Sequence, residues 1–123
     1  MSDEPTVYVV DDDEAAADSV AALTASVGMK AETFNSAEEF LAEHDRTRSG
    51  CLVLDIRLKG MSGLELQEAL AAQGSDIPII FISGHADREM SRKAMSNGAV
   101  TCLEKPFNGN DFCEIVRAVL AQK

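Results

Sequence analysis

Five polar residues each stand at the end of a short apolar run: Asp11, Asp12, Asp55, Ser83 and Lys105. An aspartate is a nucleophile that forms an acyl phosphate, and carboxylates bind divalent cations. A lysine and a hydroxyl neutralise and hold the oxygens of a phosphoryl group. Together these residue types predict the acceptance of a phosphoryl group, provided that the fold brings them to one place.

The run before Asp55 is the most informative of these segments. Residues 51–54 are Cys-Leu-Val-Leu, with Gly50 before them and a glycine-containing loop after Asp55. A short continuous apolar run of this kind predicts a strand buried on both faces, with Asp55 at its carboxyl end. In open parallel α/β sheets, ligands bind at that edge of the sheet.

Predicted helices alternate with predicted strands along the whole chain. The strands are expected at residues 6–10, 30–34, 51–55, 77–82 and 99–103, and the helices at 16–27, from 36, at 63–72, at 87–97 and from 109 onward. Alternation with short loops indicates a parallel sheet with helices on both faces. We therefore expect an α/β, flavodoxin-like (βα)5 single domain over residues 1–123, with strand order 2-1-3-4-5. In that order the first and third strands are neighbours, so Asp11, Asp12 and Asp55 converge.

Three converging carboxylates repel one another, and burying them unpaired costs free energy. A divalent cation removes this cost, and Mg²⁺ is typically held by one or two carboxylates together with waters and a phosphate. The neighbouring Asp13 and Glu14 are expected to be solvated acids at a helix start, where they suit the macrodipole. His85 is expected to be an ordinary loop residue.

Composition limits the possible partners. The chain has 123 residues, with 11 Lys and Arg against 21 Asp and Glu, and a net charge of −10. This charge argues against direct binding to nucleic acid or to an anionic membrane. The first residues are polar, and no apolar run approaches about 18 residues, so we expect a cytoplasmic location. The cysteines lack the spacing of a zinc site and are expected to be free thiols buried in the core: Cys51, Cys102 and Cys113.

The motifs taken together resemble those of response-regulator receiver domains. The matching segments are Val-Val-Asp-Asp at 9–12, Leu-Asp at 54–55, Met-Ser-Gly-Leu-Glu-Leu at 61–66, Ile-Ser-Gly-His at 82–85 and Glu-Lys-Pro-Phe at 104–107. The stretches at 83–87 and 98–107 resemble the FixJ-type branch in particular. The resemblance covers the chain from Val7 to the last predicted helix.

The resemblance implies a role for each site residue. Asp55 would accept phosphate from the phosphohistidine of a histidine kinase or phosphotransfer protein in a two-component phosphorelay. Ser83 would be the switch hydroxyl that contacts the phosphoryl group, and Lys105 would be its charge partner, joined to Pro106 by a cis bond. The protein would be a signalling domain, an enzyme only in catalysing its own phosphorylation and dephosphorylation.

The resemblance also implies the ligands of a Mg²⁺ ion. Asp12 would be the main side-chain ligand, with Asp11 acting mostly through water. Asp55 and the backbone carbonyl of Arg57 would complete the protein's share of the site.

Three positions depart from the usual receiver pattern. Lys59 stands where the family usually has proline, which predicts a more mobile loop after Asp55. Ser83 replaces the commoner threonine and should keep its hydrogen bond. Cys102 replaces the usual tyrosine or phenylalanine that rotates on activation, so the side-chain switch should be altered.

The output surface implied by the resemblance consists of the fourth helix, fifth strand and fifth helix. Relatives of the FixJ type dimerise through this face when phosphorylated and control a transcriptional domain, which this chain does not include. The alternative is a stand-alone receiver that acts through protein–protein interaction.

Other classes of protein fit the sequence less well. A haloacid-dehalogenase-like phosphatase needs a second aspartate two residues after the nucleophile, where Arg57 stands. A flavodoxin needs a Ser/Thr/Gly phosphate loop after the first strand, where residues 11–13 are three aspartates that would repel the phosphate of FMN. A silent interaction module would have no need of the complete set of five site residues.

Overall fold

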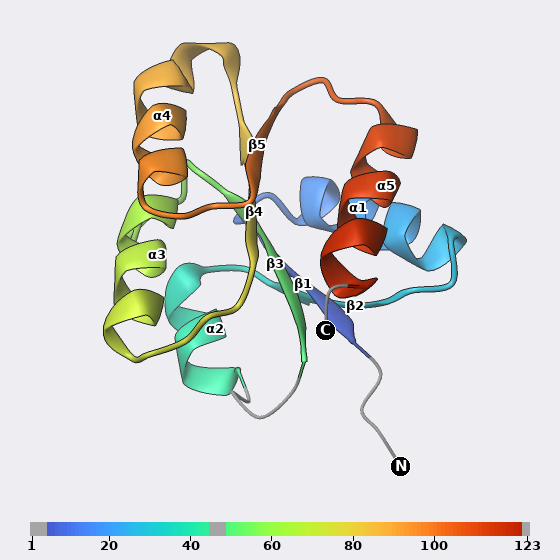
Figure 1. The fold of residues 1–123 in the computed structure, drawn as a ribbon, viewed down its shortest axis with the longest axis horizontal. Coiled ribbons are helices and arrows are strands. Elements are labelled where there is room, and N and C mark those ends of the chain that lie inside the picture. The colour runs from blue at the N-terminus through green and yellow to red at the C-terminus, as the bar shows by residue number, and fades with distance from the viewer. Residues whose placement is uncertain (1–4, 45–48, 122–123) are drawn as a thin grey trace.

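Five strands alternate with five α-helices in a computed structural model that describes residues 5–44 and 49–121 (Figure 1). The elements in chain order are β1 (Thr6–Val10), α1 (Glu14–Ser26), β2 (Lys30–Phe34), α2 (Ala37–Glu43), β3 (Gly50–Asp55), α3 (Gly63–Ala72), β4 (Ile79–Ser83), a 3-10 turn η1 (His85–Asp87), α4 (Arg88–Ser96), β5 (Thr101–Glu104) and α5 (Gly109–Ala121). The predicted alternation of strands and helices is confirmed.

The five strands form one parallel sheet in the order β2-β1-β3-β4-β5. This order confirms the predicted flavodoxin-like topology. In the register of the sheet, Val10 lies opposite Leu54, Leu54 opposite Phe81, and Ser83 opposite Glu104. The carboxyl ends of the strands are thus level, and the residues that follow them meet along one edge.

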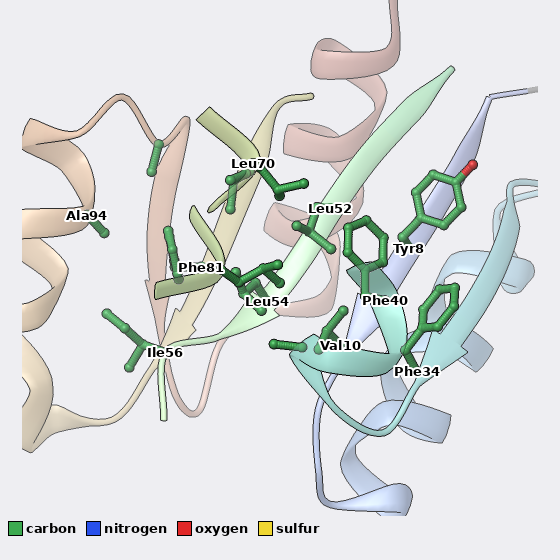
Figure 2. Close-up of a cluster of buried hydrophobic side chains, with 14 residues drawn as sticks. Tyr8, Val10, Phe34, Phe40, Leu52, Leu54, Ile56, Leu70, Phe81 and Ala94 are labelled. Atoms are coloured by element: carbon green, nitrogen blue, oxygen red, sulfur yellow. The ribbon is translucent and has the colours of Figure 1, made fainter. Parts of the chain in front are cut away.

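Helices cover both faces of the sheet, with α1 and α5 on one side and α2, α3 and α4 on the other (Figure 1). Side chains alternate along each strand, because successive residues of a strand point to opposite faces. Tyr8, Leu52 and Phe81 therefore belong to the core under α2, α3 and α4, part of which is drawn in Figure 2. Val7, Val53 and Ile80 belong to the core under α1 and α5.

Burial on both faces of the sheet explains why the sequences of β1 and β3 are continuous runs of mostly apolar residues. All of β1 and residues 50–54 of β3 are buried, since both strands lie inside the sheet with helices on each face. Only Asp55, the last residue of β3, becomes partly exposed. The strand thus carries a carboxylate to the sheet edge at the point where burial ends.

Helix boundaries differ from the predictions in details that hydrogen bonds explain. Ser36 and Glu39 have the spacing of a capping box, and Ser36 accepts from Glu39 N at 3.0 Å, but the Glu39 carboxylate accepts from Asn35 N and does not close the reciprocal bond. The complete capping box lies at the start of α3, between Ser62 and Glu65. The helix expected from residue 87 begins at Arg88, after the turn η1.

Two further expectations are settled by burial. The sequence of residues 87–97 predicts that Met90, Ala94 and Met95 make the main apolar contacts of this helix, and for Met95 this is wrong: its side chain is 44% exposed, so it lies on the outer face of α4. The free-thiol prediction holds for all three cysteines, of which Cys51 and Cys113 are buried and Cys102 is half-buried.

Expectations that concern the chain ends lie outside the described residues, since 1–4 and 122–123 are not among them. Within the described part of the chain, no helix is both long enough and apolar enough to cross a membrane.

Candidate functional site

The aspartate that ends β3 is held by groups from two different segments. Asp55 Oδ1 accepts a hydrogen bond from the backbone N–H of Arg57 at 2.9 Å. Its Oδ2 lies 3.4 Å from Nζ of Lys105, which follows β5. The Asp55 side chain is 14% exposed and that of Lys105 is 46% exposed, so this carboxylate–ammonium pair opens to solvent at the sheet edge.

Asp11 lies directly after β1 and is buried. Its Oδ1 accepts from Asp13 N at 2.9 Å. Burial raises the pKa of the Asp11 carboxyl, and the nearby charges of Asp55 and Asp12 raise it further, although the Asp13 N–H and Lys105 act in the opposite direction. The predicted clustering of negative charge around β1 and β3 is therefore present.

Asp12 is exposed and reaches across to the loop that follows β3. Its Oδ2 accepts from the backbone N–H of Lys59 at 2.9 Å. The next residue, Asp13, caps α1 by accepting from Ala15 N and Ala16 N, which confirms the helix-start interpretation of that acid. The adjacent aspartates therefore have different roles: Asp12 contacts the loop after β3, and Asp13 caps the start of α1.

Ser83 and Lys105 approach the site from the neighbouring strands. Ser83 is the last residue of β4 and is buried. Its carbonyl accepts from Lys105 N at 2.8 Å, which places the lysine beside the end of β4. The Lys105–Pro106 bond is cis, as the resemblance implied. The structure therefore brings Asp11, Asp55, Ser83 and Lys105 to one edge of the sheet.

An ion pair that was not foreseen adjoins this edge. Arg57 Nε donates to Asp87 Oδ1, and the other Asp87 oxygen accepts from Gly84 N at 2.9 Å. Burial alone would raise the pKa of Asp87, but the Gly84 N–H and the Arg57 guanidinium lower it below its ordinary value. From the sequence, Arg57 was expected to contribute only its backbone carbonyl and Asp87 to begin a helix, so neither side chain was expected to form an ion pair.

Two other contacts around the site were also missed. Glu38 of α2 accepts from Met61 N at 3.1 Å and so ties the loop after β3 to the second helix. His85 was expected to be an ordinary loop residue; it lies in the turn η1, and its Nδ1 is 3.2 Å from a Glu104 carboxylate oxygen. These pairs join residues far apart in the sequence, and no local pattern marks them.

A cavity of about 550 Å³ opens beside the Asp55–Lys105 pair. Its floor is aliphatic, formed by the side of the sheet that faces α1 and α5, and its rim carries Asp11, Asp55 and Lys105. Pro106 and Phe107 form the wall opposite α1. The cavity thus lies between the sheet, α1 and the segment after Lys105, and it has room for a donor group beside Asp55.

The side chains at this edge of the sheet offer a cation only some of the ligands it needs. The described residues contain no group of three or more His, Cys, Asp and Glu side chains arranged to hold a metal ion. A cation here would need backbone carbonyl or water ligands besides the carboxylates, which is the usual way in which Mg²⁺ is bound. The hard oxygen donors, and the mutual repulsion around Asp11, fit such an ion.

Comparison with known proteins gives a consistent result. The family model described as "Response regulator receiver domain" matches residues 7–117. Response regulator protein TodT of Pseudomonas putida is 45% identical over 121 residues, which are 98% of this chain and 53% of TodT. Transcriptional regulatory protein FixJ of Bradyrhizobium diazoefficiens is 36% identical over 122 residues, 99% of this chain and 60% of FixJ.

Two solved structures of response regulators are similar to this chain in both fold and sequence. A crystal structure titled FixJ-N has a TM-score of 0.90 at 38% identity, covering 100% of this chain and 98% of that one. Response regulator StyR has a TM-score of 0.90 at 43% identity, with 97% of this chain and 60% of that chain covered. The chain therefore spans just over half the length of TodT and about three fifths of FixJ and StyR.

Proposed function

The chain belongs to the response regulator receiver domain family, of the FixJ type, and on this premise we propose that it acts in the cytoplasm, where Asp55 accepts a phosphoryl group from the phosphohistidine of a histidine kinase or phosphotransfer protein. The observation that carries the proposal is the Asp55–Lys105 pair, at 3.4 Å, on the rim of an accessible cavity. Proteins of this family are signalling domains of two-component systems.

The chemistry follows from the groups around Asp55. A carboxylate oxygen of Asp55 forms a bond to phosphorus while the bond between phosphorus and the donor's imidazole nitrogen breaks, and the imidazole keeps the electron pair. The Arg57 N–H holds the carboxylate in position through Oδ1. Lys105 offsets charge on the phosphoryl oxygens, and the Ser83 hydroxyl donates to one of them in the phosphorylated domain.

A Mg²⁺ ion would be held by Asp11, Asp12, Asp55 and the backbone carbonyl of Arg57. When bound, such an ion neutralises the carboxylates and the incoming phosphoryl oxygens. Asp11 is the residue of this set whose burial most requires compensation, since its charge is both desolvated and beside other acids.

We further propose that the signal leaves through the face formed by α4, β5 and α5. Met95 and Val100 are large hydrophobic residues exposed at 44% and 41%, and both lie at the end of α4 that leads into β5. Exposed apolar side chains of this kind favour association with a partner or a second copy. The FixJ and DctR relatives are described as transcriptional regulatory proteins, which supports a transcriptional output domain in the complete protein.

The test of phosphoryl acceptance is an intact-mass measurement after incubation with Mg²⁺ and acetyl phosphate. The wild-type chain should gain the mass of one phosphoryl group, and Asp55→Asn should gain none. Asp18→Asn is the matched control, because Asp18 is an exposed acid of α1 that does not line the cavity beside Asp55. A mass gain that persists in Asp55→Asn would refute the assignment.

A further inference from the structure

Each carboxylate proposed as a Mg²⁺ ligand accepts one backbone N–H group in the structure. Asp11 Oδ1 accepts from Asp13 N at 2.9 Å. Asp55 Oδ1 accepts from Arg57 N, also at 2.9 Å. In both cases the donor lies two residues after the acid, in a local turn that short acidic side chains commonly form. These two acids are therefore oriented by their own neighbours in the sequence.

Asp12 is oriented by a donor that is distant in the sequence. Its Oδ2 accepts from the backbone N–H of Lys59 at 2.9 Å, and the two residues are 47 positions apart. Within residues 5–44 and 49–121, this carboxylate makes no other hydrogen bond or ion pair, and Asp12 is exposed. Among the described donors, the Lys59 N–H alone fixes the Asp12 side chain, while Oδ1 stays open to water or to a cation.

The loop that carries Lys59 is anchored on both sides of this residue. The flanking N–H groups, of Arg57 and Met61, donate to carboxylates of β3 and α2 at 2.9 and 3.1 Å. Every second N–H from residue 57 to residue 61 therefore donates to a carboxylate of a different segment. Because both flanks are held, the Lys59 N–H has a fixed position from which it holds Asp12.

The contact depends on residue 59 only through its backbone. Any residue except proline supplies the N–H, and proline, which receiver domains usually carry at this position, cannot supply it. A lysine here was expected to make the loop more mobile, and the bond to Asp12 acts in the opposite direction. Position 59 can therefore influence the proposed metal site through a single hydrogen bond.

We propose that Lys59 is a positioning residue for Mg²⁺, acting through its backbone N–H on Asp12. By holding Oδ2, the N–H restricts the carboxylate to one orientation, so less conformational freedom is lost when Oδ1 binds the ion. The inference rests on the proposed function, since it takes Asp12 as the main side-chain ligand. Partners that orient a metal-binding side chain typically contribute roughly 10–100-fold in affinity, and because Asp12 is exposed to competing water, we expect about tenfold here.

Two substitutions at position 59 isolate the N–H group. Lys59→Pro and Lys59→Ala both remove the charged side chain, but only Lys59→Pro removes the N–H. Mg²⁺ titrations of the isotope-labelled chains, followed by NMR, measure the dissociation constant, which should be about tenfold higher in Lys59→Pro than in Lys59→Ala. A purely structural role of residue 59 would change the melting temperature of the metal-free chain and leave the dissociation constant unchanged.

Amide exchange provides a second measurement that needs no proline. Coupling between two interactions is reciprocal: if the N–H helps Asp12 to bind Mg²⁺, bound Mg²⁺ strengthens the hydrogen bond. The Lys59 amide proton of the wild type should therefore exchange with water more slowly at saturating Mg²⁺. In Asp12→Ala, which lacks the acceptor, Mg²⁺ should not slow this exchange.

The outcomes separate this inference from the proposed function. Equal dissociation constants in Lys59→Pro and Lys59→Ala, or an amide exchange at Lys59 that Mg²⁺ does not slow, would overturn the positioning role and leave Asp12 as a ligand. Wild-type Mg²⁺ affinity in Asp12→Ala would show that the ion binds elsewhere, which would overturn both this inference and the proposed metal site. If Lys59→Pro does not fold, the amide exchange of the wild type decides alone.

Discussion

The guanidinium of Arg57 is paired with the carboxylate of Asp87, and this pair joins the loop after the proposed phosphoacceptor to the turn that leads into α4. The Arg57 side chain is 65% exposed and that of Asp87 is 5% exposed, so the carboxylate is held inside the protein while the guanidinium remains accessible to solvent. Asp87 also accepts from Gly84 N, which anchors it to the end of β4. A change beside Asp55 therefore has a direct polar connection to α4.

The first prediction concerns the stability that Asp87 provides. Asp87→Asn keeps the shape of the side chain but removes the charge that binds Gly84 N and Arg57, so we expect a loss of about 1–3 kcal/mol in the free energy of unfolding. Urea unfolding at pH 7 measures this loss. Asp18→Asn, an exposed acid of α1, should change the stability by no more than about 0.5 kcal/mol.

A comparison of the wild type with Asp87→Asn also tests how the free energy of unfolding depends on pH. The pKa of Asp87 is lower in the folded protein than its ordinary value of 3.8, so the charged form stabilises the fold. This stabilisation is fully present above the unfolded pKa and is lost as the pH falls through the folded pKa. The stability gap between wild type and Asp87→Asn should therefore be constant near neutrality and close below about pH 4. A gap that widens on acidification would contradict the assignment.

The second prediction concerns Mg²⁺. Burial, and after it repulsion by Asp55 and Asp12, raises the pKa of Asp11. A bound cation should offset both effects, so the melting temperature should rise with Mg²⁺ concentration. Asp12→Ala should remove most of this response, because Asp12 is the proposed main side-chain ligand. Thermal unfolding in EDTA and in increasing Mg²⁺ measures both effects. Asp111→Asn, an acid in the first turn of α5, is the control and should keep the full response.

The fold, and the placement of the residues that follow the strands, could be predicted from the sequence because both depend on local sequence patterns. Apolar runs and helical spacing are properties of neighbouring residues, and the carboxyl ends of parallel strands meet at one edge whatever the side chains do. Asp55 and Lys105 could therefore be placed together before any contact was known. Met95 was misplaced because it is the direct neighbour of Ala94, the buried residue of α4, and successive residues of a helix point about 100° apart.

The contacts that the sequence did not predict are long-range. Arg57 and Asp87 are 30 residues apart, and Met61 and Glu38 are 23 residues apart. Such pairs depend on side-chain rotamers and on the relative heights of two loops, neither of which has a periodic signature.

The third prediction concerns the close packing behind Asp55. A methyl group on Gly63 would lie 2.7 Å from the Asp55 carbonyl oxygen and 3.0 Å from Ile56 Cα, both backbone atoms that have little freedom to move. Gly63→Ala should therefore cost about 1–3 kcal/mol in the free energy of unfolding. It should also slow phosphorylation by acetyl phosphate, because α3 would be pushed from the loop after β3.

Gly84→Ala is the control for this prediction. At Gly84 the added methyl group would meet only Asp87 Oδ2, at 3.4 Å, and the backbone has φ −91°, which any residue adopts. Urea unfolding should show a much smaller loss of stability for this variant than for Gly63→Ala. Equal losses in the two variants would show that the contact with the Asp55 backbone is not what restricts position 63.

The last prediction concerns how the signal reaches α4. Cys102, in β5, is half-buried, and its Sγ lies 3.6 Å from the Ser91 carbonyl of α4. The thiol packs toward α4 and is too small to act as a rotating ring. Ser83 is buried at the end of β4 and directly precedes the Gly84–Asp87 turn that starts α4. We therefore expect the hydroxyl, and not residue 102, to carry the change.

Beryllofluoride, a mimic of the phosphoryl group, tests this expectation by NMR. In the presence of Mg²⁺ it should shift amide signals across residues 83–97 and much less in α2, where Glu38 accepts from Met61 N of the loop after β3. Cys102→Ala should leave this pattern largely intact, because it removes only the weak thiol contact with Ser91. Ser83→Ala should reduce the shifts in α4 while beryllofluoride still binds at Asp55. Shifts in α4 of full size in Ser83→Ala would mean that the Arg57–Asp87 pair, or the backbone alone, transmits the change.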